Sequence, residues 1–172
     1  GKQGWTIDSL GRLAKLDDGG WKLVSDEFPD KAIRQLQLNA AGTEGWAMGE
    51  KGVVQHLVDG KWGIDEQASG LTENEFNALW INGDATSGWA VASSYKSSEM
   101  FLLENGAWKA HPSGAFQSDD SDDVIRSLAM SQNGSVGWAG TADGGLLRYH
   151  EGKWEKTIAG GELTNLSLIS IA

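Results

Sequence analysis

The chain has 172 residues, of which 40% are apolar, so it has enough apolar material for a packed core. Its formal net charge is −10, and the sequence contains no cluster of Lys and Arg. Both facts argue against nucleic acid and anionic membranes as partners. It has no cysteine, which excludes disulfides, thiolate metal sites and cysteine nucleophiles.

Residues 1–24 carry the first copy of a pattern that the chain repeats four times. Gly4-Trp5 is followed by a turn glycine at Gly11, an apolar run, Asp18-Gly19 and a second tryptophan, Trp21. Successive first tryptophans are separated by 41, 43 and 49 residues, a period typical of stacked supersecondary units that cannot bury their apolar faces alone.

Residues 33–66 contain a whole repeat. Its landmarks, in chain order, are Ile33, Gly45-Trp46, Gly52, Asp59-Gly60 and Trp62. Asp-Gly between apolar runs favours the positive φ values of a type I′ hairpin. The pattern predicts four short antiparallel strands joined by three tight turns.

Two further copies follow. Residues 76–111 depart from the pattern at residues 93–98, where Ser-Ser-Tyr-Lys-Ser-Ser replaces a short turn and lengthens the copy by three residues. Residues 125–158 return to the pattern, with Glu151-Gly152 in the final turn. We therefore expect four blades and one loop that breaks their symmetry.

Residues 163–172 resemble the first strand of a repeat but are followed by no Gly-Trp, whereas the first copy has a Gly-Trp with no first strand before it. The two ends together would make one complete repeat, whose first strand comes from residues 163–172 and whose other strands come from residues 1–24. The sequence therefore predicts an all-β, four-bladed β-propeller, each blade a four-stranded antiparallel sheet, closed by a C-terminal inner strand that joins the N-terminal blade. The expected blades are residues 163–172 plus 1–24, 33–66, 76–111 and 125–158.

Copies of the form Gly-Trp-Ala-x-Gly, a glycine turn, an apolar strand and x-Gly-x-Trp resemble the blades of BNR-like or YVTN-like bacterial propellers, the group that includes photosystem II assembly factors. The resemblance covers the whole chain and implies a propeller fold, but such repeats serve many unrelated binding roles. The Asp-box of true BNR proteins, Ser-x-Asp-x-Gly-x-Thr-Trp, is absent. Larger members carry more blades, so a dimer and a fragment of a longer array are both alternatives.

The repeated tryptophans are predicted to pack blade against blade rather than to bind a ligand. They are Trp5, Trp21, Trp46, Trp62, Trp89, Trp108, Trp138 and Trp154. Trp80 lies outside the repeat, in a predicted innermost strand, where it either fills a blade interface or plugs the channel and contacts a ligand. Tyr95 and Lys96, in the inserted loop, are further candidates for partner binding.

Half of the 24 acidic residues fall in the segments that join one blade to the next. Because these segments share one face of a propeller, we expect a rim of negative potential there. The densest run contributes the candidate binding residues Asp119, Asp120, Asp122 and Asp123. These could offer oxygen ligands to calcium, but they lack the spacing of an EF-hand loop, so we expect a solvated acidic loop and no cofactor. Arg34 and Arg126, at the same repeat position, are predicted to pair with the acidic connections.

These residues favour a non-catalytic binding or scaffolding module that uses its acidic loop face to bind a protein or peptide of basic character. One alternative is a lectin-like propeller that binds a glycan. Another is a glycoside hydrolase with two carboxylates roughly 5 to 9.5 Å apart in a cleft. The three histidines show no metal-binding spacing, and no Gly-x-Ser-x-Gly motif is present. A secreted or periplasmic location is favoured over a cytoplasmic one, and both a monomer and a homo-oligomer are compatible with the repeats.

Overall fold

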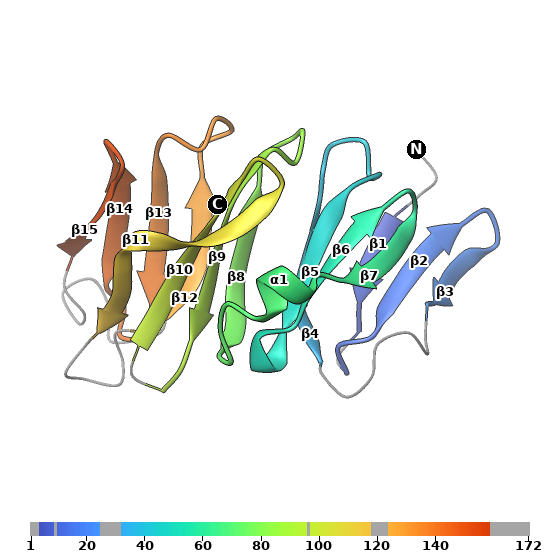
Figure 1. Ribbon diagram of the computed structural model, residues 1–172, viewed down its shortest axis with the longest axis horizontal. Coiled ribbons are helices and arrows are strands. Elements are labelled where there is room, and N and C mark those ends of the chain that lie inside the picture. Colours follow the sequence, from blue (N-terminus) through green and yellow to red (C-terminus); the bar gives the residue numbers. More distant parts are fainter. Residues whose placement is uncertain (1–3, 9, 25–31, 96, 118–123, 159–172) are drawn as a thin grey trace.

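The computed structural model describes residues 4–8, 10–24, 32–95, 97–117 and 124–158, which form four antiparallel sheets standing side by side (Figure 1). The first sheet consists of β1 (Gly4–Ile7), β2 (Leu13–Asp17) and β3 (Gly20–Leu23). The second consists of β4 (Ile33–Leu38), β5 (Gly45–Gly49), β6 (Val54–Val58) and β7 (Lys61–Ile64). Within each sheet the strands are hydrogen-bonded in chain order.

The third sheet consists of β8 (Glu75–Ile81), β9 (Ser87–Ser93), β10 (Ser97–Glu104) and β11 (Ala107–Gln117). The fourth consists of β12 (Ile125–Met130), β13 (Gly137–Thr141), β14 (Leu146–His150) and β15 (Lys153–Ile158). Two short helical segments were not predicted: a 3₁₀ turn at Glu50–Gly52 and α1 (Glu66–Ser69) in the connection between the second and third sheets. The predicted all-β class and the meandering four-stranded unit are confirmed.

The final hairpin of three sheets has the predicted geometry. Both central residues have positive φ in Asp59-Gly60, Asn105-Gly106 and Glu151-Gly152, as a type I′ turn requires. The first sheet differs, because neither Asp18 nor Gly19 has positive φ and the left-handed residue is Gly20, at +105°. There the Asp17 carboxylate accepts a hydrogen bond from the Gly19 N–H at 2.8 Å, so a side chain stabilises the turn instead.

The glycine of the repeated Gly-Trp pair is explained by a close approach of two strands. A Cβ added to Gly45 would lie 2.2 Å from the Gln37 carbonyl oxygen, and one added to Gly88 would lie 2.8 Å from the Trp80 carbonyl oxygen. No side chain fits at these distances. In the second, third and fourth sheets the glycine therefore lets the second strand pair closely with the first. In the second and third sheets the tryptophan beside it faces the neighbouring sheet.

Each core of the molecule lies between two successive sheets rather than within one. Leu13, Ile33, Leu57 and their neighbours fill the space between the first and second sheets. A second cluster of buried residues joins the second and third sheets, and a third joins the third and fourth. The packing is closest along the first strands, where β8 contacts both β4 and β12. A blade alone would leave its apolar face exposed, which is the behaviour expected of a repeat unit.

A β-bulge recurs in the first strand of the second, third and fourth sheets. The register shifts between Ile33 and Gln35, and again at the same repeat position in β8 and β12. In the second sheet the bulged residue is Arg34, which pairs with Glu50 and, at 3.4 Å, with Glu75 of the next sheet. The pair with Glu75 confirms the predicted pairing of Arg34 with an acidic connection, whereas Glu50 lies in the turn between β5 and β6.

The first and last sheets lie at opposite ends of the row (Figure 1). In the part of the chain that the structure describes, the first sheet has three strands. The strand predicted to complete it, residues 163–172, lies outside the described residues. Closure of the propeller by that strand therefore stays a prediction.

Candidate functional site

A groove of about 360 Å³ lies between the first and second sheets. Two residues of the first sheet line one wall, and two turns of the second sheet line the other. The lining residues are Trp5, Lys15, Gly42, Thr43, Glu44, Val58, Asp59 and Gly60. Because both sheets contribute, the groove exists only when they are packed together.

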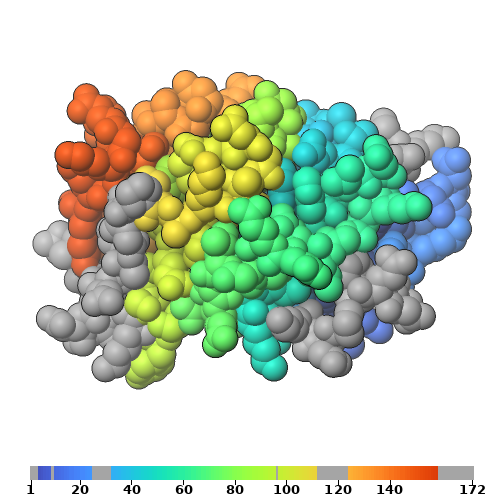
Figure 2. Space-filling model, viewed as in Figure 1, coloured from blue at the N-terminus to red at the C-terminus, as the bar shows by residue number. Residues whose placement is uncertain are grey.

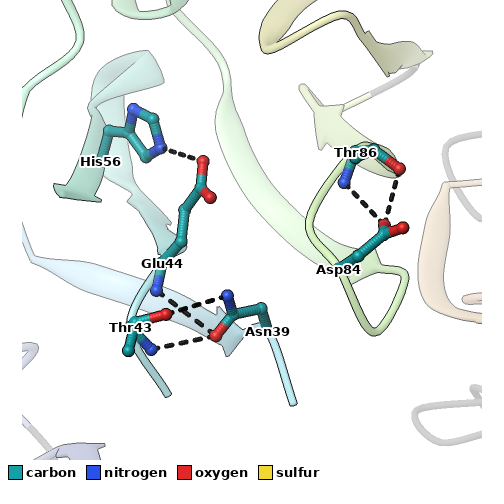
Figure 3. Close-up of polar contacts among 6 residues, drawn as sticks. All are labelled: Asn39, Thr43, Glu44, His56, Asp84 and Thr86. Carbon is teal, nitrogen blue, oxygen red and sulfur yellow. Dashed lines mark hydrogen bonds and ion pairs between the residues drawn. The ribbon is translucent and has the colours of Figure 1, made fainter. Parts of the chain in front are cut away.

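The β4–β5 turn holds one rim of the groove in a fixed shape (Figure 3). The Asn39 side-chain oxygen accepts hydrogen bonds from the Thr43 N–H at 2.9 Å and the Glu44 N–H at 3.3 Å, and its amide nitrogen donates to the Thr43 hydroxyl at 3.2 Å. The turn also needs the left-handed φ of +71° at Gly42. An asparagine in this position satisfies backbone groups that the strands cannot reach.

Glu44 is positioned at this rim by a histidine. Its carboxylate lies 3.2 Å from the His56 Nε2 (Figure 3). The His56 ring stacks on Trp46 with centroids 4.3 Å apart and an interplanar angle of 8°. The Glu44 side chain remains 41% exposed. A carboxylate is therefore presented to solvent from a rigid support, as recognition of a cation requires.

The groove combines charge with apolar surface. The Lys15 ammonium lies 5.2 Å from the Trp5 ring centroid, within range of a cation–π interaction, and Trp5 itself packs edge-on against Trp62. Val58, an apolar residue on the opposite rim, is 49% exposed. With Glu44 and Asp59 as carboxylates, this surface suits a flexible chain that offers an apolar side chain next to a basic one.

Several described acids in or beside the blade connections make contacts within the fold. Asp65 accepts a hydrogen bond from the Ala68 N–H at 2.9 Å and so caps α1. Glu99 accepts hydrogen bonds from the Thr72 hydroxyl and, at 3.1 Å, from the Asn74 amide. Among the described acids of the blade connections, Asp65 and, through Arg34, Glu75 are thus engaged in contacts within the fold.

The inserted segment of the third sheet is partly strand rather than loop. Ser93 ends β9 and Ser97 begins β10, so both strands extend into the inserted segment. The buried Ser93 and Ser98 hydroxyls lie 2.8 Å apart, and Ser98 accepts a hydrogen bond from the Ile125 N–H of the fourth sheet at 2.9 Å. The insertion therefore anchors the fourth sheet, and it carries Tyr95 with 76% of its surface exposed.

Trp80 and Tyr95, two separate candidates for ligand or partner binding, lie far apart in the third sheet. Trp80 is paired with Trp89 at the beginning of β9, whereas Tyr95 follows Ser93 at the other end of the same strand. At about 3.3 Å per residue the two positions are roughly 20 Å apart. The Trp80 ring is half-buried against the turn at Gly134, 3.5 Å from the place of an added Cβ, so it fills a blade interface.

The repeated tryptophans do not all share one environment. Five of them are buried, Trp5 is half-buried, and Trp21 and Trp138 are 55% and 37% exposed. Lys96 and the candidate calcium ligands Asp119, Asp120, Asp122 and Asp123 lie outside the described residues. Within the described ranges, no three acidic or histidine side chains converge as metal ligands, and no helix has the length and apolar character needed to cross a membrane.

Sequence reasoning missed Lys15, Glu44, Val58 and Asp59 as candidate binding residues. One signal was available, because the residue paired with the first tryptophan of a sheet is Lys15, His56 or Arg148 in three sheets. A cationic or imidazole side chain therefore lies beside the Gly-Trp pair in three sheets, whereas Leu102 takes this position in the third. This pattern does not indicate which pair opens onto a groove.

Comparison with known proteins supports the fold. No family model matches the chain, and no curated protein matches it in sequence. The structure of YCF48 bound to D1 peptide is similar, with a TM-score of 0.62 and 16% identity, over 95% of this chain and 53% of that chain. This chain thus spans about half the length of that neighbour. The likeness identifies the four sheets as blades of a β-propeller.

Proposed function

We propose that this chain is a non-catalytic propeller module that binds a peptide or an extended protein segment in the groove between its first and second sheets. The observation that carries the proposal is the pairing of Trp5 and Val58, which offer apolar surface, with Glu44 and Asp59, which offer carboxylates at the rim. YCF48, which is similar in fold, was solved with a D1 peptide bound.

The bound segment is expected to carry a basic residue next to an apolar one. The chain as a whole is strongly acidic, and Glu44 is held in place by His56. Opposite charge speeds encounter and selects the partner, while the apolar contact lowers the dissociation rate. Rising ionic strength should therefore weaken binding.

We also propose that the repeats belong to the BNR-like or YVTN-like group. The Gly-Trp-Ala-x-Gly strand supports this assignment, since the glycine is required by strand approach and the tryptophan contributes to the blade interface. An aligned set of homologous sequences with the same Gly-Trp spacing would test it.

Selection of a displayed random peptide library on the 172-residue chain tests the proposed function. We expect enriched peptides to pair Lys or Arg with an apolar residue, and Glu44→Gln together with Asp59→Asn to weaken their affinity at least about tenfold. Tyr95→Ala, on the opposite face, is the matched control and should bind as the parent does. Loss of binding in Tyr95→Ala alone would instead support the acidic loop face.

Glycan-array screening tests the lectin-like alternative. Binding of a glycan that is lost in Trp80→Ala, with the fold retained by circular dichroism, would contradict the peptide-binding proposal. Release of a reducing sugar from that glycan by the parent chain would support the hydrolase alternative.

A further inference from the structure

The same pair of tryptophans joins each sheet to the next. The first tryptophan of one sheet contacts the second tryptophan of the following sheet edge-on, in the pairs Trp5–Trp62, Trp46–Trp108 and Trp89–Trp154. Their centroids are 5.6, 5.8 and 5.6 Å apart, and the rings cross at 89°, 88° and 88°. Such uniform geometry, repeated at three interfaces, makes this pair the standard junction between blades.

Two members of this set have no counterpart within the row. Trp21, the second tryptophan of the first sheet, is 55% exposed, and Trp138, the first tryptophan of the fourth sheet, is 37% exposed. They lie at the two ends of the molecule, where Figure 2 shows the first and last sheets. Each end therefore presents one half of a junction.

Trp21 already has the position of a tryptophan in a formed junction. Its ring lies over Gly4, 3.4 Å from an added Cβ, just as the Trp108 ring lies over Gly88, 3.1 Å from an added Cβ. Leu23, on the same side of β3, is 48% exposed. This end face is shaped to receive a neighbouring blade.

The end face of the fourth sheet, which carries Trp138, resembles the first-tryptophan side of a formed junction. The Arg148 guanidinium lies 5.8 Å from the Trp138 ring centroid, as Lys15 lies 5.2 Å from the Trp5 ring. Because Trp5 packs against Trp62 with Lys15 in place, the cation leaves room for the incoming tryptophan. Trp138 is thus prepared to accept a second tryptophan from another sheet.

We infer that a second copy of this chain covers both end faces, head to tail, so that Trp138 of each copy packs edge-on against Trp21 of the other. The described sheets stand in an open row with the first and fourth at its two ends (Figure 1), and the chain aligns with about half of a longer chain of similar fold. Two such rows joined end to end give a ring of eight blades, within the range of known propellers. The two junctions are equivalent, and the ring is closed by a twofold axis, which prevents a filament.

Light scattering coupled to size-exclusion chromatography of the 172-residue chain tests this assembly. We expect a mass of twice 18.4 kDa that dissociates on dilution. Trp21→Glu and Trp138→Glu should each weaken the dimer at least about thirtyfold in Kd, since each substitution damages both junctions. Tyr95→Glu, a substitution of an exposed aromatic residue away from both ends, should leave the dimer intact.

Mixing the two variants distinguishes head-to-tail pairing from other arrangements. Trp21→Glu keeps an intact fourth sheet and Trp138→Glu keeps an intact first sheet, so the mixture should recover a dimer with one good junction. A monomeric parent chain at all concentrations overturns the inference. A dimer that survives either single variant also overturns it, because it uses another surface. If Trp21→Glu is unfolded by circular dichroism, Leu23→Glu on the same face replaces it.

Discussion

At the scale of single residues, the most constrained positions are glycines and tryptophans that stand next to each other. Gly45 must lack a side chain because the Gln37 carbonyl lies where its Cβ would be, and Trp46 beside it is fully buried against the third sheet. Gly45 thus allows the close spacing of β4 and β5 within the second sheet, and Trp46 contributes to the contact between the second and third sheets.

Replacement of Gly45 by alanine should be far more damaging than the same change at Gly63. The added methyl at Gly45 would overlap backbone, which neighbours cannot relieve by changing rotamer, so we expect a loss of about 3 kcal/mol or more. At Gly63, a strand residue of the same sheet, nothing lies within 4 Å of an added Cβ, and the change should stay within about 0.5 kcal/mol. Urea unfolding of both variants measures the difference, and equal losses would refute the close approach.

Asp84 contributes to stability through its charge. Hydrogen bonds from the Thr86 hydroxyl and then from the Thr86 N–H hold the pKa of Asp84 below its ordinary value of 3.8 (Figure 3). A carboxyl with a lowered pKa in the folded state stabilises the fold above the unfolded value, and this stabilisation disappears as the pH falls through the folded value.

Asp84→Asn should therefore be less stable than the parent at pH 7, and the difference should shrink as the pH falls below 3.8. Urea unfolding in steps from pH 7 downward measures it. Asp59→Asn controls for the loss of one negative charge from an acidic chain and should show no such destabilisation, because asparagine suits the positive φ at that turn. A gap between Asp84→Asn and the parent that is independent of pH would contradict the role of the carboxylate.

At the scale of elements, the turns explain why copies of one pattern are not interchangeable. The β14–β15 turn places Glu151 at a φ of +51°, whereas its counterpart in the third sheet is Asn105 at the same angle. Glutamate has no local hydrogen bond to offset the left-handed conformation, while asparagine adopts it readily. The equivalent β2–β3 turn has a different backbone conformation, in which the residue with positive φ is Gly20.

Glu151→Asn should stabilise the chain by about 0.5 to 1 kcal/mol. The matched substitution Asp18→Asn, at the equivalent sequence position of the first sheet, should give no gain, because Asp18 has no positive φ. Thermal unfolding followed by circular dichroism compares the two variants. A gain at Asp18 as large as that at Glu151 would show that the two turns have the same geometry.

At the scale of the whole molecule, stability depends on the spaces between sheets. Each of the three cores is built from two sheets, so no blade carries a core of its own. Sheets related in this way are expected to unfold together, because loss of one exposes the face of the next. The first sheet, with three described strands, is the place where this dependence is weakest.

Deletion of residues 163–172 tests the predicted closing strand. These residues would complete the first sheet of the same chain in a four-bladed ring, or that of the second copy in the proposed eight-bladed ring. In either case the truncated chain should lose an edge strand and unfold over a broader range of urea, with a lower m-value. The parent chain at the same concentration is the control. An unchanged midpoint and an unchanged m-value would contradict closure by this segment.

The candidate site was less predictable than the fold. Turn dipeptides and the repeated Gly-Trp identified the strands correctly, but the groove combines Trp5 and Lys15 with Glu44 and Val58 of another sheet. Nothing local marks such a meeting of distant segments. In the same way, Trp21 and Trp108 occupy equivalent positions of the repeat, so the sequence predicts the same role for both. Among the described sheets, Trp108 packs against a neighbouring sheet and is buried, whereas Trp21 does not and is exposed.

The sequence by itself determined the strand order within each sheet, the hairpins and the repeated unit, because strand alternation and turn conformation depend on residues close together in the chain. Only the tertiary structure decided which tryptophans are buried, where the groove opens and why Trp80 and Tyr95 are apart. Those features depend on how one sheet lies against the next, and burial is a property of the neighbour as much as of the residue.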